Sequence, residues 1–142
     1  MVTTAGTVLS VNVGSVRTFE YNGRPAKSAI WKSPALGRIA ARGVNLAGDD
    51  QADRKAHGGP DKAVYAYAVE DARWWQKEVG RSLEPGEFGE NLTTEGIELN
   101  HALVGERHRT ADPLVLEHLI AEYDARKVGV DAERAATATR VI

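Results

Sequence analysis

Glycine spacing most restricts how this chain can fold, because it leaves room for mostly short elements in the first hundred residues. The chain has 14 glycines, and β-favouring segments lie between them, beginning with residues 7–13. Asn22-Gly23 is the pair that most readily forms a tight hairpin turn, and it separates expected strands at 16–21 and 26–31. Because Pro25 follows directly, we expect a connection longer than two residues. Many short strands joined by glycine turns predict a mainly β fold, a barrel or a sandwich, with helices on its outside.

Other elements are expected further along the chain. Short strands are predicted at 63–68 and 97–99, and a helix at 70–79 with Gly80 as its stop signal. Trp75 shares one face of that helix with Ala72 and Val79, so we interpret it as a core residue. Asp112-Pro113 begins a further predicted helix of about four turns that runs until Gly129, and a second one is expected at 132–139.

Length and charge limit the classes of protein. A chain of 142 residues is expected to form one domain, here a core at 1–110 and a helical tail at 111–142. The formal net charge of −2 argues against a general nucleic-acid partner. Residues 1–62 hold nine Lys/Arg against five Asp/Glu, so an anion site should draw on this half. With no cationic leader and no run of roughly 18 apolar residues, we expect a cytoplasmic protein with no membrane partner.

Several kinds of reactive site are excluded by the residues present. The chain has no cysteine, which removes disulfides, thiolate metal sites and cysteine nucleophiles. The four histidines lack metal-binding spacing, and we expect no metal held by side chains. None of the serines lies in a GxSxG context, and neither GxGxxG nor GxxxxGK[ST] occurs. Serine hydrolases, dinucleotide-binding folds and P-loop enzymes are therefore poor matches.

The segment 48–62 carries the most chemistry. It has only two apolar residues, both alanine, and is expected to be a long exposed loop. Backbone N–H groups around His57-Gly58-Gly59 can converge on an anion, with charge supplied by Arg54, Lys55 and Lys62. Alternatively, the segment is a surface turn in which local ion pairs neutralise these cations through Asp49, Asp50, Asp53 and Asp61.

A second candidate is the turn at 86–92. Asn91 can present both a donor and an acceptor there, and the flanking glycines let a ligand approach the backbone. The alternative is an ordinary β-turn with Phe88 in the core.

Five sequence blocks closely resemble the MOSC domain, the C-terminal module of molybdenum cofactor sulfurases, and in particular its stand-alone YiiM-like branch. In order, they are Ser28-Ala29-Ile30-Trp31-Lys32, Gly48-Asp49-Asp50-Gln51-Ala52-Asp53-Arg54-Lys55, His57-Gly58-Gly59-Pro60-Asp61-Lys62-Ala63-Val64-Tyr65-Ala66-Tyr67, Phe88-Gly89-Glu90-Asn91-Leu92-Thr93 and Val104-Gly105-Glu106-Arg107. The resemblance covers roughly residues 5–107.

The resemblance implies a distorted β-barrel with flanking helices that binds the pterin-type molybdenum cofactor. Family members look like sulfur carriers or reductases of N-hydroxylated bases and amines. The residues that would line the cofactor's phosphate and pterin are Arg54, Lys55, His57, Gly58, Gly59, Asp61 and Lys62, with Asn91 nearby.

The chain departs from the family after Arg107. In the family this block leads into further barrel strands and a Pro-Cys segment whose thiolate binds molybdenum or carries sulfur, whereas here Asp112-Pro113 opens helices. Two explanations stay open: a natural alternative ending, or an out-of-frame terminus that leaves the barrel incomplete. Exposed strand edges would then be covered by the helix at 113–127 or by a second subunit in a homodimer.

Two functions follow as hypotheses. One is a molybdenum-dependent oxidoreductase, impaired by the lack of the family cysteine, and the other is a non-catalytic module that binds a phosphorylated ligand or assists assembly. The sequence identifies no catalytic residue, substrate or redox partner.

Overall fold

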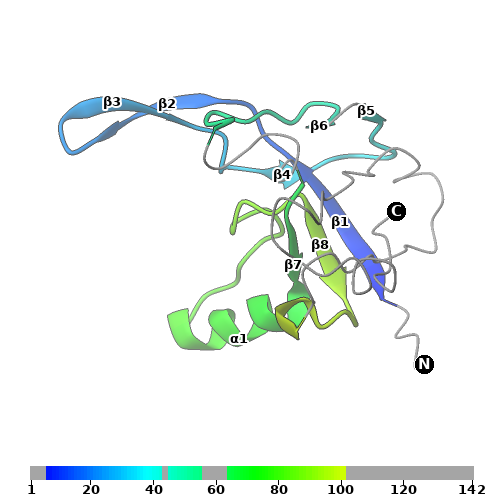
Figure 1. Cartoon of the computed structure of the whole chain (residues 1–142). Helices are drawn as coiled ribbons and strands as arrows, with labels where there is room; N and C mark the ends of the chain where they lie inside the picture. The colour runs from blue at the N-terminus through cyan, green and yellow to red at the C-terminus, as the bar shows by residue number, and fades with distance from the viewer. Residues whose placement is uncertain (1–5, 43–44, 56–63, 102–142) are drawn as a thin grey trace, which may run out of the picture.

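The computed structural model describes residues 6–42, 45–55 and 64–101. This part of the chain is mainly β, as expected, and contains one α-helix and a 3-10 turn (Figure 1). The elements are β1 (Thr7–Val13), β2 (Arg17–Tyr21), β3 (Arg24–Ser28), β4 (Ser33–Pro34), β5 (Ala41–Arg42), β6 (Asn45–Leu46), β7 (Ala66–Ala68), α1 (Val69–Val79), β8 (Leu92–Glu95) and η1 (Leu99–His101).

The central sheet has four strands in the order β4-β1-β8-β7. β1 is antiparallel to both β4 and β8, whereas β7 runs parallel to β8. The register between β1 and β8 shifts between Val8 and Ser10, which marks a bulge at Leu9. Within the described ranges the sheet does not close on itself, so the expected distorted barrel is open here.

The β2–β3 hairpin extends away from the central sheet (Figure 1). Tyr21 pairs with Arg24, which leaves only Asn22 and Gly23 in the turn, both with positive φ (51° and 73°). The predicted longer connection was therefore wrong. Pro25 is tolerated because it occupies the non-hydrogen-bonded pair next to the turn, where a backbone N–H would point away from β2.

The helix is confirmed, but the predicted role of Trp75 is wrong. α1 ends at Val79, and Gly80 takes the left-handed conformation (φ 68°) while its N–H donates to the Gln76 carbonyl. Only Ala72 of this helix is buried, and the Trp75 side chain is 42% exposed and packs edge-on against Trp74. Helical spacing shows which residues share one face of the helix. It does not show how much of that face the rest of the protein covers.

Two other expectations differ from the structure. The predicted strand at 97–99 is absent: the chain bends there and enters η1 at Leu99. Strand β7 is shorter than predicted and begins at Ala66, after Tyr65 has accepted two backbone hydrogen bonds. The expected helices after residue 111 lie outside the described residues. No described helix has the length and apolarity that crossing a membrane requires.

Polar residues make up much of the buried core where β1 meets β8. Asn12, Glu90, Asn91, Thr93 and Thr94 are each at most 3% exposed. Such groups are stable inside a protein only when hydrogen bonds replace their contacts with water. The start of β8 is therefore a polar junction, and it lies beside the cavity described below.

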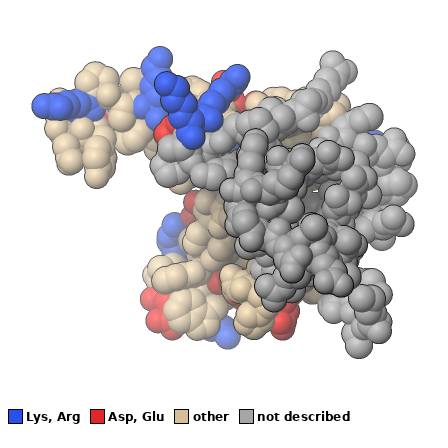
Figure 2. All heavy atoms as spheres, viewed as in Figure 1, with Lys and Arg blue, Asp and Glu red and all other residues tan. Residues whose placement is uncertain are grey.

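Charge is unevenly distributed over the described surface. Figure 2 shows Lys and Arg side chains gathered over the β2–β3 hairpin, whereas several of the visible Asp and Glu side chains lie around α1. The excess of Lys and Arg in residues 1–62 is therefore visible where the hairpin forms this face.

Candidate functional site

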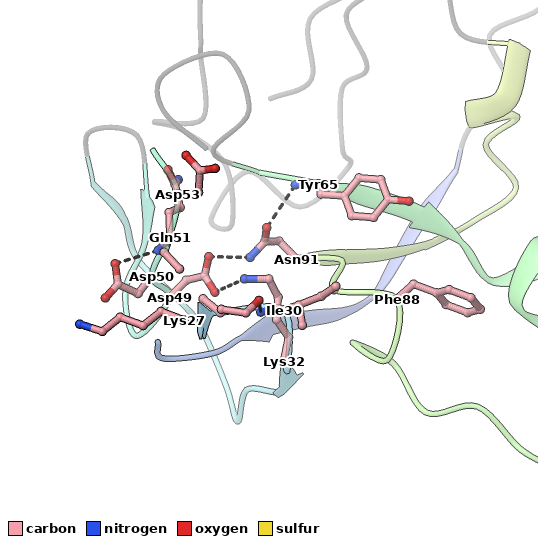
Figure 3. A pocket seen from close by; sticks show the side chains of 14 residues that line it. Lys27, Ile30, Lys32, Asp49, Asp50, Gln51, Asp53, Tyr65, Phe88 and Asn91 are labelled. Atoms are coloured by element: carbon pink, nitrogen blue, oxygen red, sulfur yellow. Dashed lines mark hydrogen bonds and ion pairs between the residues drawn. The ribbon is translucent and has the colours of Figure 1, made fainter. Parts of the chain in front are cut away.

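A cavity of about 550 Å³ lies where four separate segments of the chain meet. They are the chain from β3 toward β4, the loop after β6, the residue before β7 and the turn before β8 (Figure 3). Its lining comprises Lys27, Ser28, Ala29, Ile30, Lys32, Asp49, Asp50, Gln51, Ala52, Asp53, Tyr65, Phe88, Gly89 and Asn91. Its volume falls within the range typical of small-molecule sites.

A buried ion pair lies at this cavity. The Lys32 Nζ is 2.5 Å from Asp49 Oδ1, and the two side chains are only 8% and 1% exposed. The same carboxylate oxygen accepts a hydrogen bond from the Gly14 N–H at 2.9 Å. Because removing two charges from water is costly, such a pair persists only when further hydrogen bonds satisfy it.

Asn91, a predicted site residue, lies on the cavity wall and uses its whole amide within the protein. Its Nδ2 donates to Asp49 Oδ2 at 2.9 Å and to the Asn12 carbonyl at 3.1 Å. Its Oδ1 accepts from the Tyr65 N–H at 3.1 Å. Asn91 therefore fixes the relative positions of β1, the 49–53 loop and the chain before β7, and both of its side-chain N–H groups donate within the protein.

Glu90 holds the turn that precedes Asn91. It is 2% exposed, and its Oε1 accepts from the Gly86 N–H at 2.6 Å and from the Thr93 hydroxyl at 2.9 Å. Its Oε2 accepts from the Phe88 N–H at 3.2 Å. Glycine is required at 86, because φ is 94° and a Cβ would lie 2.6 Å from the Lys32 carbonyl oxygen. This carboxylate therefore sets the turn against the chain that carries Lys32.

Aromatic rings form one side of the cavity and of the surface next to it. Tyr65 and Phe88 line the cavity, and Phe88 stacks on Tyr67 with ring centroids 4.4 Å apart. Burial, followed by the charges of neighbouring groups, raises the pKa of the Tyr65 phenol. The phenol is therefore neutral at physiological pH and available as a donor or acceptor.

Only part of the predicted anion loop lies within the described residues. Arg54 is exposed and its Nη2 lies 3.4 Å from Asp50 Oδ1, while the Lys55 N–H donates to Asp53 Oδ1 at 3.0 Å. Neither Arg54 nor Lys55 lines the cavity, although Asp50 and Asp53 do. The other predicted site residues lie outside the described residues and stay a prediction: His57, Gly58, Gly59, Asp61 and Lys62.

The loop also contains a residue that the sequence analysis placed wrongly. Asp49 was expected on an exposed surface, where the alternative reading paired it with the loop's own cations, yet it is buried against Lys32, 17 residues away. The Asp50–Arg54 contact does match that alternative. Lys32 and Glu90 were not predicted as site residues, although both fall within the family-like blocks.

The described side chains do not form a metal site of their own. No group of three or more His, Asp or Glu that could hold an ion occurs among residues 6–42, 45–55 and 64–101. The sequence contains no cysteine to add a thiolate.

Comparison with known proteins identifies the family. The model of the MOSC domain matches residues 53–140, which is more than half of the chain. The chain belongs to the MOSC domain family. The match continues beyond Arg107 and therefore includes most of the segment that was expected to depart from the family.

Individual MOSC relatives agree with this assignment. The chain is 39% identical over 108 residues to the uncharacterized protein YflK of Bacillus subtilis, covering 76% of this chain and 49% of YflK. It is 33% identical over 110 residues to YiiM of Escherichia coli, covering 75% and 48%. A reductase of Gibberella moniliformis is 28% identical over 117 residues, covering 79% of this chain and 20% of the reductase.

Among solved structures, YiiM of Geobacillus stearothermophilus matches 71% of this chain and 44% of its own, with a TM-score of 0.44 and 26% identity. The aligned region spans about half the length of YflK and YiiM.

Proposed function

We propose that this MOSC chain binds a pterin-type molybdenum cofactor, with the organic part in the cavity and the phosphate at the cationic loop that follows it. The observation that carries the proposal is the position of the cavity. Its wall includes Asp50 and Asp53, and the chain then continues directly into Arg54, Lys55 and the paired glycines. A planar ligand with a phosphate at one end matches a cavity that is followed along the chain by a cationic, glycine-containing loop.

The residues present fit the organic part of this cofactor. Ile30, Tyr65 and Phe88 offer apolar and aromatic surface to a planar ring. The Asp50 carboxylate can accept hydrogen bonds from the N–H groups of an aminopyrimidinone edge, and the Tyr65 phenol can do the same. Lys27 and the loop cations supply positive charge for a phosphate.

The metal end of the cofactor receives less from this chain. A protein thiolate on molybdenum would have to come from outside the chain, because it has no cysteine. When bound, the cofactor would supply the oxygen-transfer chemistry that reduces N-hydroxylated bases and amines, as the family resemblance implies. This chain's own residues bind and orient the cofactor and hold its phosphate.

The experiment is to purify the protein from a host that makes the cofactor and to measure molybdenum and pterin per chain. We expect both to approach one per chain, and cofactor binding to raise the thermal midpoint. Arg54→Ala and Lys62→Ala should lower the occupancy, whereas Lys77→Ala removes the same charge from α1 and should not. Protein without molybdenum or pterin, and without a thermal shift on adding pterin phosphates, would contradict the proposal.

A second candidate function is favoured by the missing cysteine. It is the non-catalytic binding of a phosphorylated ligand by the same loop. It predicts a thermal shift with pterin phosphates in protein that contains no molybdenum, and that Arg54→Ala and Lys62→Ala reduce this shift.

A further inference from the structure

The two lysines that line the cavity are in different electrostatic states. Lys32 is almost fully buried and paired with Asp49. Lys27, in β3, is exposed and forms no ion pair with any residue in the described ranges. Figure 3 shows the Lys27 ammonium extending away from the Lys32–Asp49 pair. Only one of the two charges is therefore available to an anionic ligand.

Three donors of different kinds converge on the Asp49 carboxylate. They are the Lys32 ammonium at 2.5 Å, the Gly14 backbone N–H at 2.9 Å and the Asn91 amide at 2.9 Å. An ammonium, a backbone N–H and a side-chain amide are the groups with which proteins bind carboxylate and phosphate ligands. The arrangement has the chemistry of an oxyanion site whose occupant is the protein's own side chain.

The donors are held by the fold and not by Asp49 alone. Asn91 is fixed by its further bonds to the Asn12 carbonyl and the Tyr65 N–H. The Lys32 carbonyl lies against Gly86, in the turn that Glu90 holds. Removal of the Asp49 carboxylate should therefore leave much of the donor set in place.

We propose that Lys32, the Gly14 N–H and Asn91 form an oxyanion site that Asp49 fills, which makes Asp49 a specificity-determining residue of the cavity. The carboxylate neutralises Lys32, so the anionic group of a ligand is kept from this position and is directed toward Lys27 and the cationic loop. The proposal rests on the proposed function only in taking the cavity as the ligand site. It also predicts that removing the carboxylate opens a site for small oxyanions.

Chemical rescue tests this inference. Asp49→Ala removes the carboxylate, and sodium formate supplies a small one from solution through the cavity that Asp49 lines. At a formate concentration ten times its dissociation constant, the ratio of folded to unfolded Asp49→Ala protein should rise about elevenfold. The measurement is urea unfolding followed by tryptophan fluorescence, with sodium chloride at equal ionic strength as the reference. Wild-type protein should change less than about twofold, because its site is filled.

Two control variants separate this site from general salt effects. Asp50→Ala removes the neighbouring carboxylate, which is 44% exposed and, among the cations of the described residues, contacts only Arg54 at 3.4 Å, and it should show no rescue. Asp49→Ala combined with Lys32→Met removes the ammonium as well and should abolish the rescue.

A folded-to-unfolded ratio of Asp49→Ala that rises in proportion to formate concentration and depends on Lys32 supports the proposal. No rescue, or equal rescue of the double variant, overturns it. If Asp49→Ala is unfolded in buffer, refolding in formate but not in chloride supports the proposal, and refolding in neither overturns it. Because the readout involves no cofactor, a failure here is distinguishable from a failure of cofactor binding.

Discussion

Replacement of Asn91 by alanine tests whether the amide network at the start of β8 holds the site together. The substitution removes three hydrogen bonds from a residue that is 2% exposed. Two of them have neutral backbone partners and are worth about 1 kcal/mol each, and the third goes to a carboxylate and is worth about 1.5–3 kcal/mol. The sum is about 4 kcal/mol, but water from the cavity can replace part of it, so we expect a loss of about 2–4 kcal/mol in unfolding free energy.

The assay is urea unfolding at neutral pH, followed by tryptophan fluorescence, with the midpoint lowered and the slope unchanged. Asn100→Ala is the matched control, because the Asn100 amide also donates to a carboxylate, that of Asp71 at 2.8 Å, but on an exposed surface. It should cost less than about 0.5 kcal/mol. A loss below about 1 kcal/mol for Asn91→Ala, or equal losses for the two variants, would show that burial of the network is not what stabilises this junction.

Two further predictions concern the turns near the site. Gly86→Ala should destabilise the protein by more than the roughly 1 kcal/mol expected for Gly80→Ala. Both glycines have positive φ, but only at Gly86 would the new Cβ meet backbone, the Lys32 carbonyl oxygen at 2.6 Å. Equal urea midpoints for the two variants would contradict this. The pKa of the Glu87 carboxyl is lowered, first by its bidentate contact with Arg81 and second by the backbone N–H of residue 84. The ionised Glu87 therefore stabilises the folded protein above the unfolded pKa, and this contribution is lost as pH falls through the lower folded pKa. Arg81→Gln should return the pKa of Glu87 toward its ordinary value in an NMR titration, and an unchanged value would show that the arginine is not the cause.

Part of the candidate site was predictable from the sequence. Asn91 was identified from its position after a glycine-rich turn, and it does line the cavity. Its role was not predictable, because the groups that occupy its amide come from Asn12, Asp49 and Tyr65, between 26 and 79 residues away. A pattern within one loop contains no information about such distant partners.

What the sequence determined by itself is local. The end of α1 at Gly80 and the turn at Asn22-Gly23 follow from backbone conformations that these residues adopt at low cost, and the short glycine-bounded segments confine the described chain to a mainly β fold. Only the tertiary structure decided which polar groups are buried. Asp49 and Asp50 are neighbours in one charged loop, yet the Asp49 side chain is 1% exposed and that of Asp50 is 44% exposed. The physical reason is that a charge is stable away from water only where distant segments bring it compensating donors, and Lys32, Gly14 and Asn91 do so at Asp49.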